Sequence, residues 1–182
     1  MVGEPIVAVD PINTVTVPGS PVADDFLSAD GGAEAWWRSE GTRVPDGDLP
    51  DVLALRRLRS ALRDMIEALV DGRPVSTAAV SELNFFMQSA PASTRLQLTG
   101  TGLHTETCWH WEFGGNPRLA FIATQAAEFL CEPLQVCRLR RCANPACSMI
   151  FIAVNPRRSW CTPGICGNRA RVARHHRRAD RA

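Results

Sequence analysis

Four of the seven cysteines in this 182-residue chain form two matching pairs near the C-terminus. Four residues separate Cys142 from Cys147, four separate Cys161 from Cys166, and thirteen residues lie between the pairs. Each pair encloses a proline-containing segment, ANPA or TPGI, that favours a tight turn presenting two sulfurs. Two such turns can hold one Zn²⁺ tetrahedrally through four thiolates, and a site with all four positions filled is structural. The sequence therefore predicts one structural zinc ion.

Disulfides and buried free thiols are the alternatives for these four residues. Disulfides are rare in cytoplasmic proteins, and cysteines scattered through a core have no reason to fall in matched pairs. The remaining cysteines, Cys108, Cys131 and Cys137, are expected to be ordinary buried residues. Cys137 also precedes Cys142 by the same spacing, but it falls in an expected strand (134–141) that would pair with a strand at 149–154.

An arginine-rich segment follows the second cysteine pair. Residues 168–178 contain neither Gly nor Pro and are expected to form a helix. At about 100° per residue, three arginines fall on one face of this helix. A guanidinium can bind a phosphate or a guanine edge, so this face is expected to contact nucleic acid, together with two arginines beside Trp160. The candidate nucleic-acid-binding residues are Arg157, Arg158, Arg171, Arg174 and Arg178.

Arg169 lies on a different side of the same expected helix. It follows Cys166 by three residues, about one helical turn. Its guanidinium would be placed to hydrogen-bond nearby carbonyls or to offset the negative charge of the zinc centre. We therefore expect a structural role for Arg169.

Charge is distributed very unevenly along the chain. Residues 1–137 carry 9 Arg and 18 acidic residues, whereas residues 138–182 carry 11 Arg and one acidic residue, Asp180. Such asymmetry favours a polyanionic partner for the basic part. DNA is the first expectation and RNA the second, because no base-stacking sheet is evident. The rival interpretation is a protein-interaction module that docks on an acidic protein surface, including that of a second copy, and a homodimer is left open.

The preceding part of the chain has the patterns of a mainly helical domain with one β-hairpin, giving an α+β fold overall. Residues 6–9 are expected to form a short edge strand or an ordered arm, and Asp30 to cap the first helix. A domain of residues 1–133 and a zinc module of residues 134–182 follow from the change in pattern. The expected elements are helices at about 30–41, 51–70, 76–89 and 116–132, and a hairpin at about 96–111.

The sequence lacks the usual signatures of an enzyme or a membrane protein. All 20 basic residues are Arg, which excludes lysine chemistry and a GxxxxGK phosphate loop. His104-Thr105-Glu106 matches half of a zinc-deaminase motif, but the chain has no Pro-Cys-x-x-Cys. No apolar run approaches the roughly 18 residues of a membrane helix, and the N-terminus lacks a basic start. We expect a cytoplasmic protein that is not an enzyme and has no membrane partner.

Several of these segments resemble one known protein architecture. The runs at 141–147 (RCANPAC), 157–161 (RRSWC) and 166–169 (CGNR) resemble the CGNR-type zinc finger. That finger follows a stress-associated N-terminal domain called ABATE, in proteins described as bacterial transcription regulators. Residues 10–14 (DPINT) resemble the opening Asp-Phe-x-Asn-Thr of that domain, with Pro11 in place of Phe, and Trp36 falls in the expected tryptophan-bearing helix. The resemblance implies a DNA-binding regulator with an N-terminal sensing domain, in which Asn13 and Thr14 are candidates for a small-molecule pocket.

Overall fold

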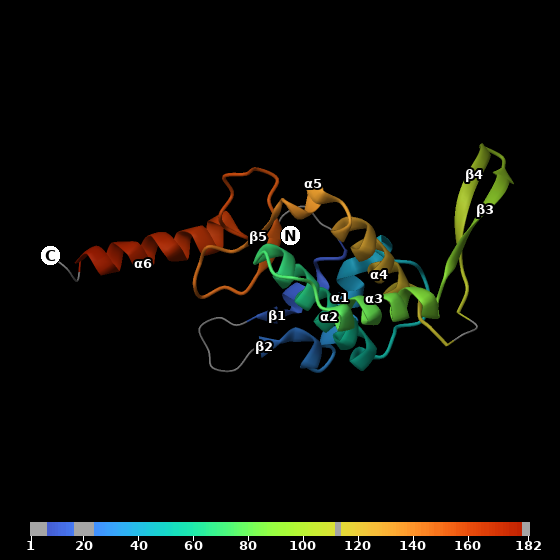
Figure 1. Cartoon of the computed structure of the whole chain (residues 1–182), viewed down its shortest axis with the longest axis horizontal. Helices are drawn as coiled ribbons and strands as arrows, with labels where there is room; N and C mark the ends of the chain where they lie inside the picture. The colour runs from blue at the N-terminus through green and yellow to red at the C-terminus, as the bar shows by residue number, and fades with distance from the viewer. Residues whose placement is uncertain (1–6, 17–23, 112–113, 180–182) are drawn as a thin grey trace.

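The computed structural model describes residues 7–16, 24–111 and 114–179, with side chains as far as residue 173. Figure 1 shows a central helical body, a β-hairpin that projects from one end, and a C-terminal module whose last helix projects from the other end. Within the described residues the strands form three separate two-stranded antiparallel sheets. The α+β class expected from the sequence is confirmed.

Helix α2 (Val52–Val70) lies at the centre of the body. The Asp51 carboxylate caps it by accepting a hydrogen bond from the Leu53 amide at 3.2 Å, and the chain leaves the helix at Gly72, whose φ is +66°. One face of α2 is apolar throughout, and burying each leucine there contributes about 1.5–3 kcal/mol. The residues of this face without any exposed surface are Leu55, Leu58, Leu62 and Ile66.

Three further helices pack around α2: α1 (Gly32–Glu40), α3 (Thr77–Ser89) and α4 (Pro117–Leu130). Ser76 and Asn116, at the expected starts of two helices, cap α3 and α4 through their side-chain oxygens. The prediction that Asp30 caps α1 is wrong. Gly31 precedes this helix with a φ of +70°, and no side chain caps it.

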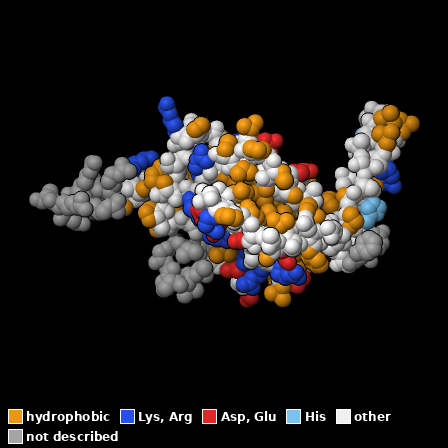
Figure 2. All heavy atoms as spheres, viewed as in Figure 1, with side chains coloured by type: hydrophobic (Ala, Val, Ile, Leu, Met, Phe, Trp, Pro, Cys, Tyr) orange, Lys and Arg blue, Asp and Glu red, His pale blue; other side chains and the backbone are white. Residues whose placement is uncertain are grey.

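The hairpin of β3 (Ala92–Thr99) and β4 (Gly102–Trp109) has its outer part far from the body (Figure 1). Leu98 pairs directly with Leu103, and Leu96 lies two residues before Leu98 on the same face. These three leucines are 64–79% exposed. Figure 2 shows apolar side chains gathered at the tip of this arm. The sequence predicted the hairpin but not that it would project from the body.

The N-terminal segment does not form the expected edge strand. Residues 7–10 form a turn that leads into the 3-10 helix η1 (Pro11–Thr14), and Ile6 lies outside the described residues. Pro11 lacks a backbone donor and has a fixed φ, which suits the first turn of a helix better than a strand. The alternative of an ordered arm fits, because Ala8 is fully buried in the core. The chain then runs through β1 (Val15–Thr16), β2 (Asp24–Asp25) and the 3-10 helix η2 (Phe26–Ser28).

The C-terminal module begins with a second, smaller hairpin. Strand β5 (Leu139–Arg141) pairs with β6 (Ile150–Ile152). The expected strand from residue 134 starts later than predicted, because Glu132 caps the short helix α5 (Pro133–Val136) through its carboxylate. The π-helical turn η4 (Pro163–Gly167) and helix α6 (Asn168–Ala179) complete the module.

The two faces of this small hairpin belong to different apolar clusters. Ile150 and Ile152 point to one face and pack with Leu139 into the core of the helical body. Phe151 points to the other face and packs with the cysteines. Arg141 adds two hydrogen bonds, at 3.1 and 2.9 Å, to the Asp71 carboxylate at the end of α2. The zinc module is therefore packed against the body and not merely tethered to it.

Candidate metal centre and nucleic-acid interface

The four paired cysteines meet at one point. Their sulfur atoms all lie within 4.8 Å of one another. The Cys147 and Cys161 sulfurs are 3.8 Å apart, and those of Cys161 and Cys166 are 3.5 Å apart. At the usual Zn–S distance of about 2.3 Å, a tetrahedral site places its sulfurs about 3.8 Å apart. The arrangement therefore fits one tetrahedral zinc ion without rebuilding the loops.

Two backbone turns present these sulfurs. In the first, the Cys142 amide donates to the Met149 carbonyl at 2.9 Å, and the Cys147 amide donates to the Asn144 carbonyl at 2.9 Å. In the second, the Cys166 amide donates to the Thr162 carbonyl at 2.8 Å. Hydrogen bonds that fix the backbone on each side of a ligand orient it for the metal. Both turns lie where the sequence predicts them.

Burial affects how readily two of the four thiols ionise. Burial raises the pKa of Cys147 to about 11 and also raises the pKa of Cys161. Without metal, these two thiols are therefore protonated at neutral pH. Since zinc binds thiolates, its binding must release protons, and the affinity of the site for zinc must fall as pH falls.

Arg158, one of the candidate nucleic-acid contacts, is partly buried against the second turn. Its guanidinium donates to the Trp160 carbonyl at 3.0 Å and to the Cys161 carbonyl, and its charged carbon lies 5.0 Å from the centre of the Phe151 ring. These contacts hold the guanidinium against the second turn. The role foreseen for Arg169, hydrogen bonding to carbonyls beside the zinc centre, therefore belongs to Arg158.

The other candidate arginines, and Arg169, lie at the surface of the module or beyond its described side chains. Arg157 and Arg169 are exposed, and neither side chain has a hydrogen bond or ion pair with the described part of the chain. Arg171 is exposed and donates to the Asn168 side-chain oxygen at 3.3 Å. Arg174 and Arg178 lie on the backbone of α6, but their side chains are outside the described residues.

The other three cysteines are not the buried residues that we expected. Cys108 is half-buried, and Cys131 and Cys137 are exposed. Cys131 and Cys137 follow the last residues of α4 and α5, where the chain turns at the surface. The apolar pattern around them predicted burial but did not show these helix ends.

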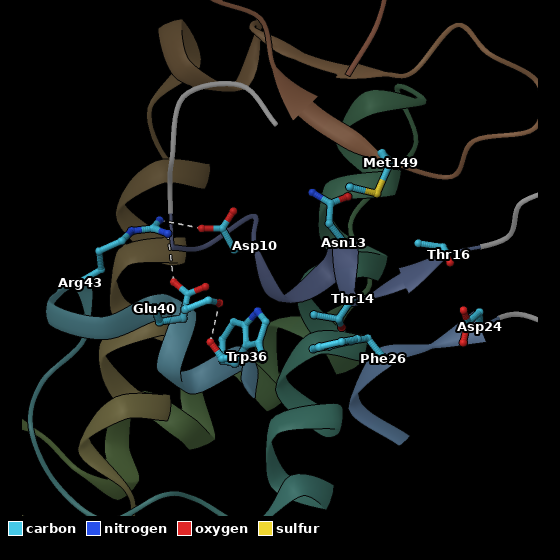
Figure 3. Close-up of a pocket in the computed structure, with 11 residues that line it drawn as sticks. Asp10, Asn13, Thr14, Thr16, Asp24, Phe26, Trp36, Glu40, Arg43 and Met149 are labelled. Atoms are coloured by element: carbon cyan, nitrogen blue, oxygen red, sulfur yellow. Dashed lines mark hydrogen bonds and ion pairs between the residues drawn. The ribbon is translucent and has the colours of Figure 1, made fainter. Parts of the chain in front are cut away.

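Asn13 and Thr14 line a cavity of about 460 Å³ beside α1 (Figure 3). Both side chains are also engaged in holding the fold. The Asn13 side-chain amide donates to the Ile150 carbonyl at 2.8 Å and accepts from the Ile150 amide at 3.1 Å. Asn13 thus continues the hydrogen bonding of β6 and joins the N-terminal segment to the zinc module.

Thr14 is the end of a buried polar chain. Its hydroxyl donates to the Pro11 carbonyl at 2.7 Å and accepts from Arg59 at 3.0 Å. Arg59, which is 6% exposed, also donates to the Asp25 carboxylate at 2.7 Å. The hydrogen bond from Arg59 is the main reason why the pKa of Asp25 is lowered to about 2. Thr14 therefore connects the cavity wall to α2.

Sequence reasoning did not find the charged wall of this cavity. Arg43, from the 3-10 helix η3 (Gly41–Arg43), lies 2.6 Å from the Asp10 carboxylate and 3.1 Å from that of Glu40. Glu40 is only 4% exposed, and burial raises its pKa to about 7. The sole local signal was the three-residue spacing of Glu40 and Arg43, which is common on exposed helices.

The fold and the site define a helical domain that carries a four-cysteine zinc finger. Residues 7–133 match the ABATE family, described as "Putative stress-induced transcription regulator", and residues 138–179 match the CGNR zinc finger. The chain belongs to the ABATE family and ends in a zinc finger of the CGNR type, with one structural zinc. These are regulator and zinc-finger families, not enzyme families.

None of the curated proteins matches the chain. Among the described residues, no helix combines the length and the apolar composition needed to cross a membrane.

Proposed function

We propose that this protein is a DNA-binding regulator of transcription that acts in the cytoplasm. The observation that carries the proposal is α6, which projects from the zinc centre away from the body (Figure 1). Its sequence, NRARVARHHRRA, contains five arginines and no acidic residue. None of the seven cysteines forms a disulfide, which agrees with a reducing compartment.

The dimensions and chemistry of α6 suit a DNA groove. Twelve residues of helix extend about 18 Å, and the major groove of about 12 Å width admits a helix. The zinc turns fix the start of the helix, where Arg169 and Arg171 are exposed. We propose that Arg157, Arg169 and Arg171 contact DNA together with Arg174 and Arg178, and that Arg158 supports the module from inside. In this proposal residues 134–182 bind DNA and residues 1–133 regulate that binding.

Fluorescence anisotropy with labelled duplex DNA at several salt concentrations tests the proposal. Replacing Arg171, Arg174 and Arg178 by Ala should weaken binding and reduce the salt slope by about 0.9 for each phosphate that the variant no longer neutralises. Replacing the exposed Arg38, Arg73 and Arg95 changes the net charge equally but leaves α6 intact, so this control should retain wild-type affinity. Both variants should keep one zinc per chain.

The same experiment decides between DNA and the alternative partners. Wild-type DNA affinity in the α6 variant would contradict the proposal and favour docking of the basic module on an acidic protein surface. Tighter binding to single-stranded or duplex RNA of matched sequence would favour RNA. Genome-wide selection of bound DNA by the purified chain would then identify the preferred sequence.

A further inference from the structure

The cavity in Figure 3 lies where the N-terminal part of the chain meets the zinc module. Residues of η1, β1, β2, η2, α1 and η3 line it, and Met149, which precedes β6 of the zinc module, borders it from the opposite direction. Its volume of about 460 Å³ falls within the range of small-molecule sites. A ligand here would touch both parts of the protein.

Acidic groups lie at two separate places around the cavity. Asp10 and Glu40 are on one side, and Asp24 is on the far side, beyond Thr14 and Phe26 (Figure 3). Arg43 is the only basic residue among the described lining residues. The lining therefore has three carboxyl groups for one guanidinium, an excess of negative charge that favours a cation.

The excess of negative charge affects Glu40 most. One of its carboxylate oxygens is buried and forms no hydrogen bond with the described residues, although Arg43 lies 3.1 Å away. Arg43 is shared with Asp10, and a single guanidinium cannot neutralise two carboxylates. The raised pKa of Glu40 agrees with this shortage of positive charge. A second cation in the cavity, which Glu40 lines, would supply the missing charge.

The geometry favours an extended organic cation over a metal ion. Among the described residues, the four zinc cysteines are the only group of three or more His, Cys, Asp or Glu side chains close enough to hold a metal. Between the acidic groups the cavity has apolar surface from Met149 and from Phe26, which is 48% exposed. An alkyl chain can lie against such surface while charged ends reach the carboxylates.

We propose that this cavity binds a small organic diamine. One ammonium group lies beside Glu40 and the second beside Asp24. The alkyl chain between them lies against Phe26 and Met149, so the ligand contacts the segment that joins the zinc module to Asn13. The proposal concerns the chain alone and does not rest on its binding to DNA.

Isothermal titration calorimetry of the zinc-loaded chain with putrescine and cadaverine tests this site. Butylamine keeps one of the two charges, and 1,4-butanediol keeps the length without charge. We expect the diamines to bind, butylamine to bind more weakly, and the diol not to bind. At pH 7, titrations in phosphate and in Tris should give different heats, because binding ionises Glu40 and releases its proton to the buffer.

Variants locate the binding and separate it from folding. Glu40→Gln should weaken diamine binding about tenfold or more and abolish the proton release. Asp24→Asn, at an exposed position, should weaken it about two- to fivefold without affecting folding. Glu82→Gln, at a half-buried glutamate paired with Arg57 outside the cavity, is the matched control and should bind as the wild type does.

Three results would overturn the proposal: no detectable binding of either diamine, equal affinity for putrescine and 1,4-butanediol, or wild-type affinity in Asp24→Asn. Equal affinity for putrescine and butylamine would overturn the two-ended arrangement. If Glu40→Gln fails to fold, Asp24→Asn and the comparison of ligands still decide the question.

Discussion

The zinc centre and the N-terminal cavity each bring acidic groups together, but they differ in where the compensating charge comes from. At the zinc centre, a metal ion from outside the chain compensates the four thiolates, since Arg158 donates to the Cys161 carbonyl and not to a sulfur. At the cavity, Arg43 of the chain itself lies between Asp10 and Glu40. The metal holds its loops in place, whereas the arginine leaves one carboxyl group incompletely compensated.

This difference indicates which site is structural and which is free to respond. A four-thiolate zinc site is closed and stable, so it can define the position of α6. A buried carboxyl group with a pKa of about 7 changes its charge near neutral pH and gains from any added cation. Asn13 connects the two sites through Ile150.

Loss of zinc should have the largest effect. Structural zinc typically contributes about 10–16 kcal/mol of apparent binding free energy, more than the small apolar cluster around Phe151 can replace. In a Cys161→Ser, Cys166→Ser variant, residues 142–167 should lose protection from hydrogen exchange while α2 remains protected. Strands β5 and β6 should lose less protection, since Ile150 and Ile152 pack in the core of the body.

Hydrogen exchange measured by mass spectrometry, with elemental analysis for zinc, checks this expectation. Cys131→Ser alters an exposed cysteine outside the cluster and should change neither measurement. Unchanged exchange in the metal-free double variant would contradict a structural role for zinc. Unfolding of α2 as well would show that the two regions are one cooperative unit.

The connection between the two sites should have the next largest effect. Asn13→Ala removes both hydrogen bonds to Ile150 and leaves a buried amide and carbonyl without them, which costs about 2–3 kcal/mol. Urea unfolding followed by tryptophan fluorescence measures the change. Asn84→Ala, at an exposed position of α3, is the control. Equal stability of the two variants would mean that Asn13 does not join the two parts.

Because the charge of Glu40 is incompletely compensated, we expect the stability of the fold to depend on pH. The pKa of Glu40 is about 7 in the folded chain and 4.5 for an ordinary glutamate. Between these two values the folded state binds more protons than the unfolded state, so this group stabilises the fold less as pH rises. The free energy of unfolding of Glu40→Gln, relative to that of the wild type, should therefore be about 1–2 kcal/mol higher at pH 8 than at pH 5.5.

Urea unfolding of the wild type and of Glu40→Gln at both pH values measures this gain. Glu128→Gln, at an exposed position of α4, should show no such dependence. A gain that is constant with pH would mean that Arg43 compensates both carboxylates fully, and the contrast between the two sites would disappear.

The two regions also differ in how far the sequence could predict them. All four zinc ligands lie within 25 consecutive residues, so their spacing alone shows the site. The helices were predictable because leucines recur at helical intervals and because Ser76 and Asn116 are strong caps. Asp10 precedes η1, whereas Asp24 and Glu40 lie on β2 and α1, and only the packing of these segments brings the three carboxyl groups to one cavity.

Substitutions of Arg158 and Arg169 should have the smallest effects and give the most specific test. The sequence predicts a structural role for Arg169 and a DNA contact for Arg158, whereas their positions in the fold favour the opposite assignment. Arg158 binds two carbonyls beside the zinc centre, whereas Arg169 is exposed. Losing the hydrogen bonds of Arg158 should cost about 1 kcal/mol, so Arg158→Ala should release zinc to a chelator about fivefold faster. Arg169→Ala should release zinc at the wild-type rate and weaken DNA binding. Faster zinc release from Arg169→Ala and weaker DNA binding by Arg158→Ala would be the reverse result. It would place Arg169 at the zinc centre and assign Arg158 to DNA, and the contact of α6 with DNA would then begin one helical turn after Arg169.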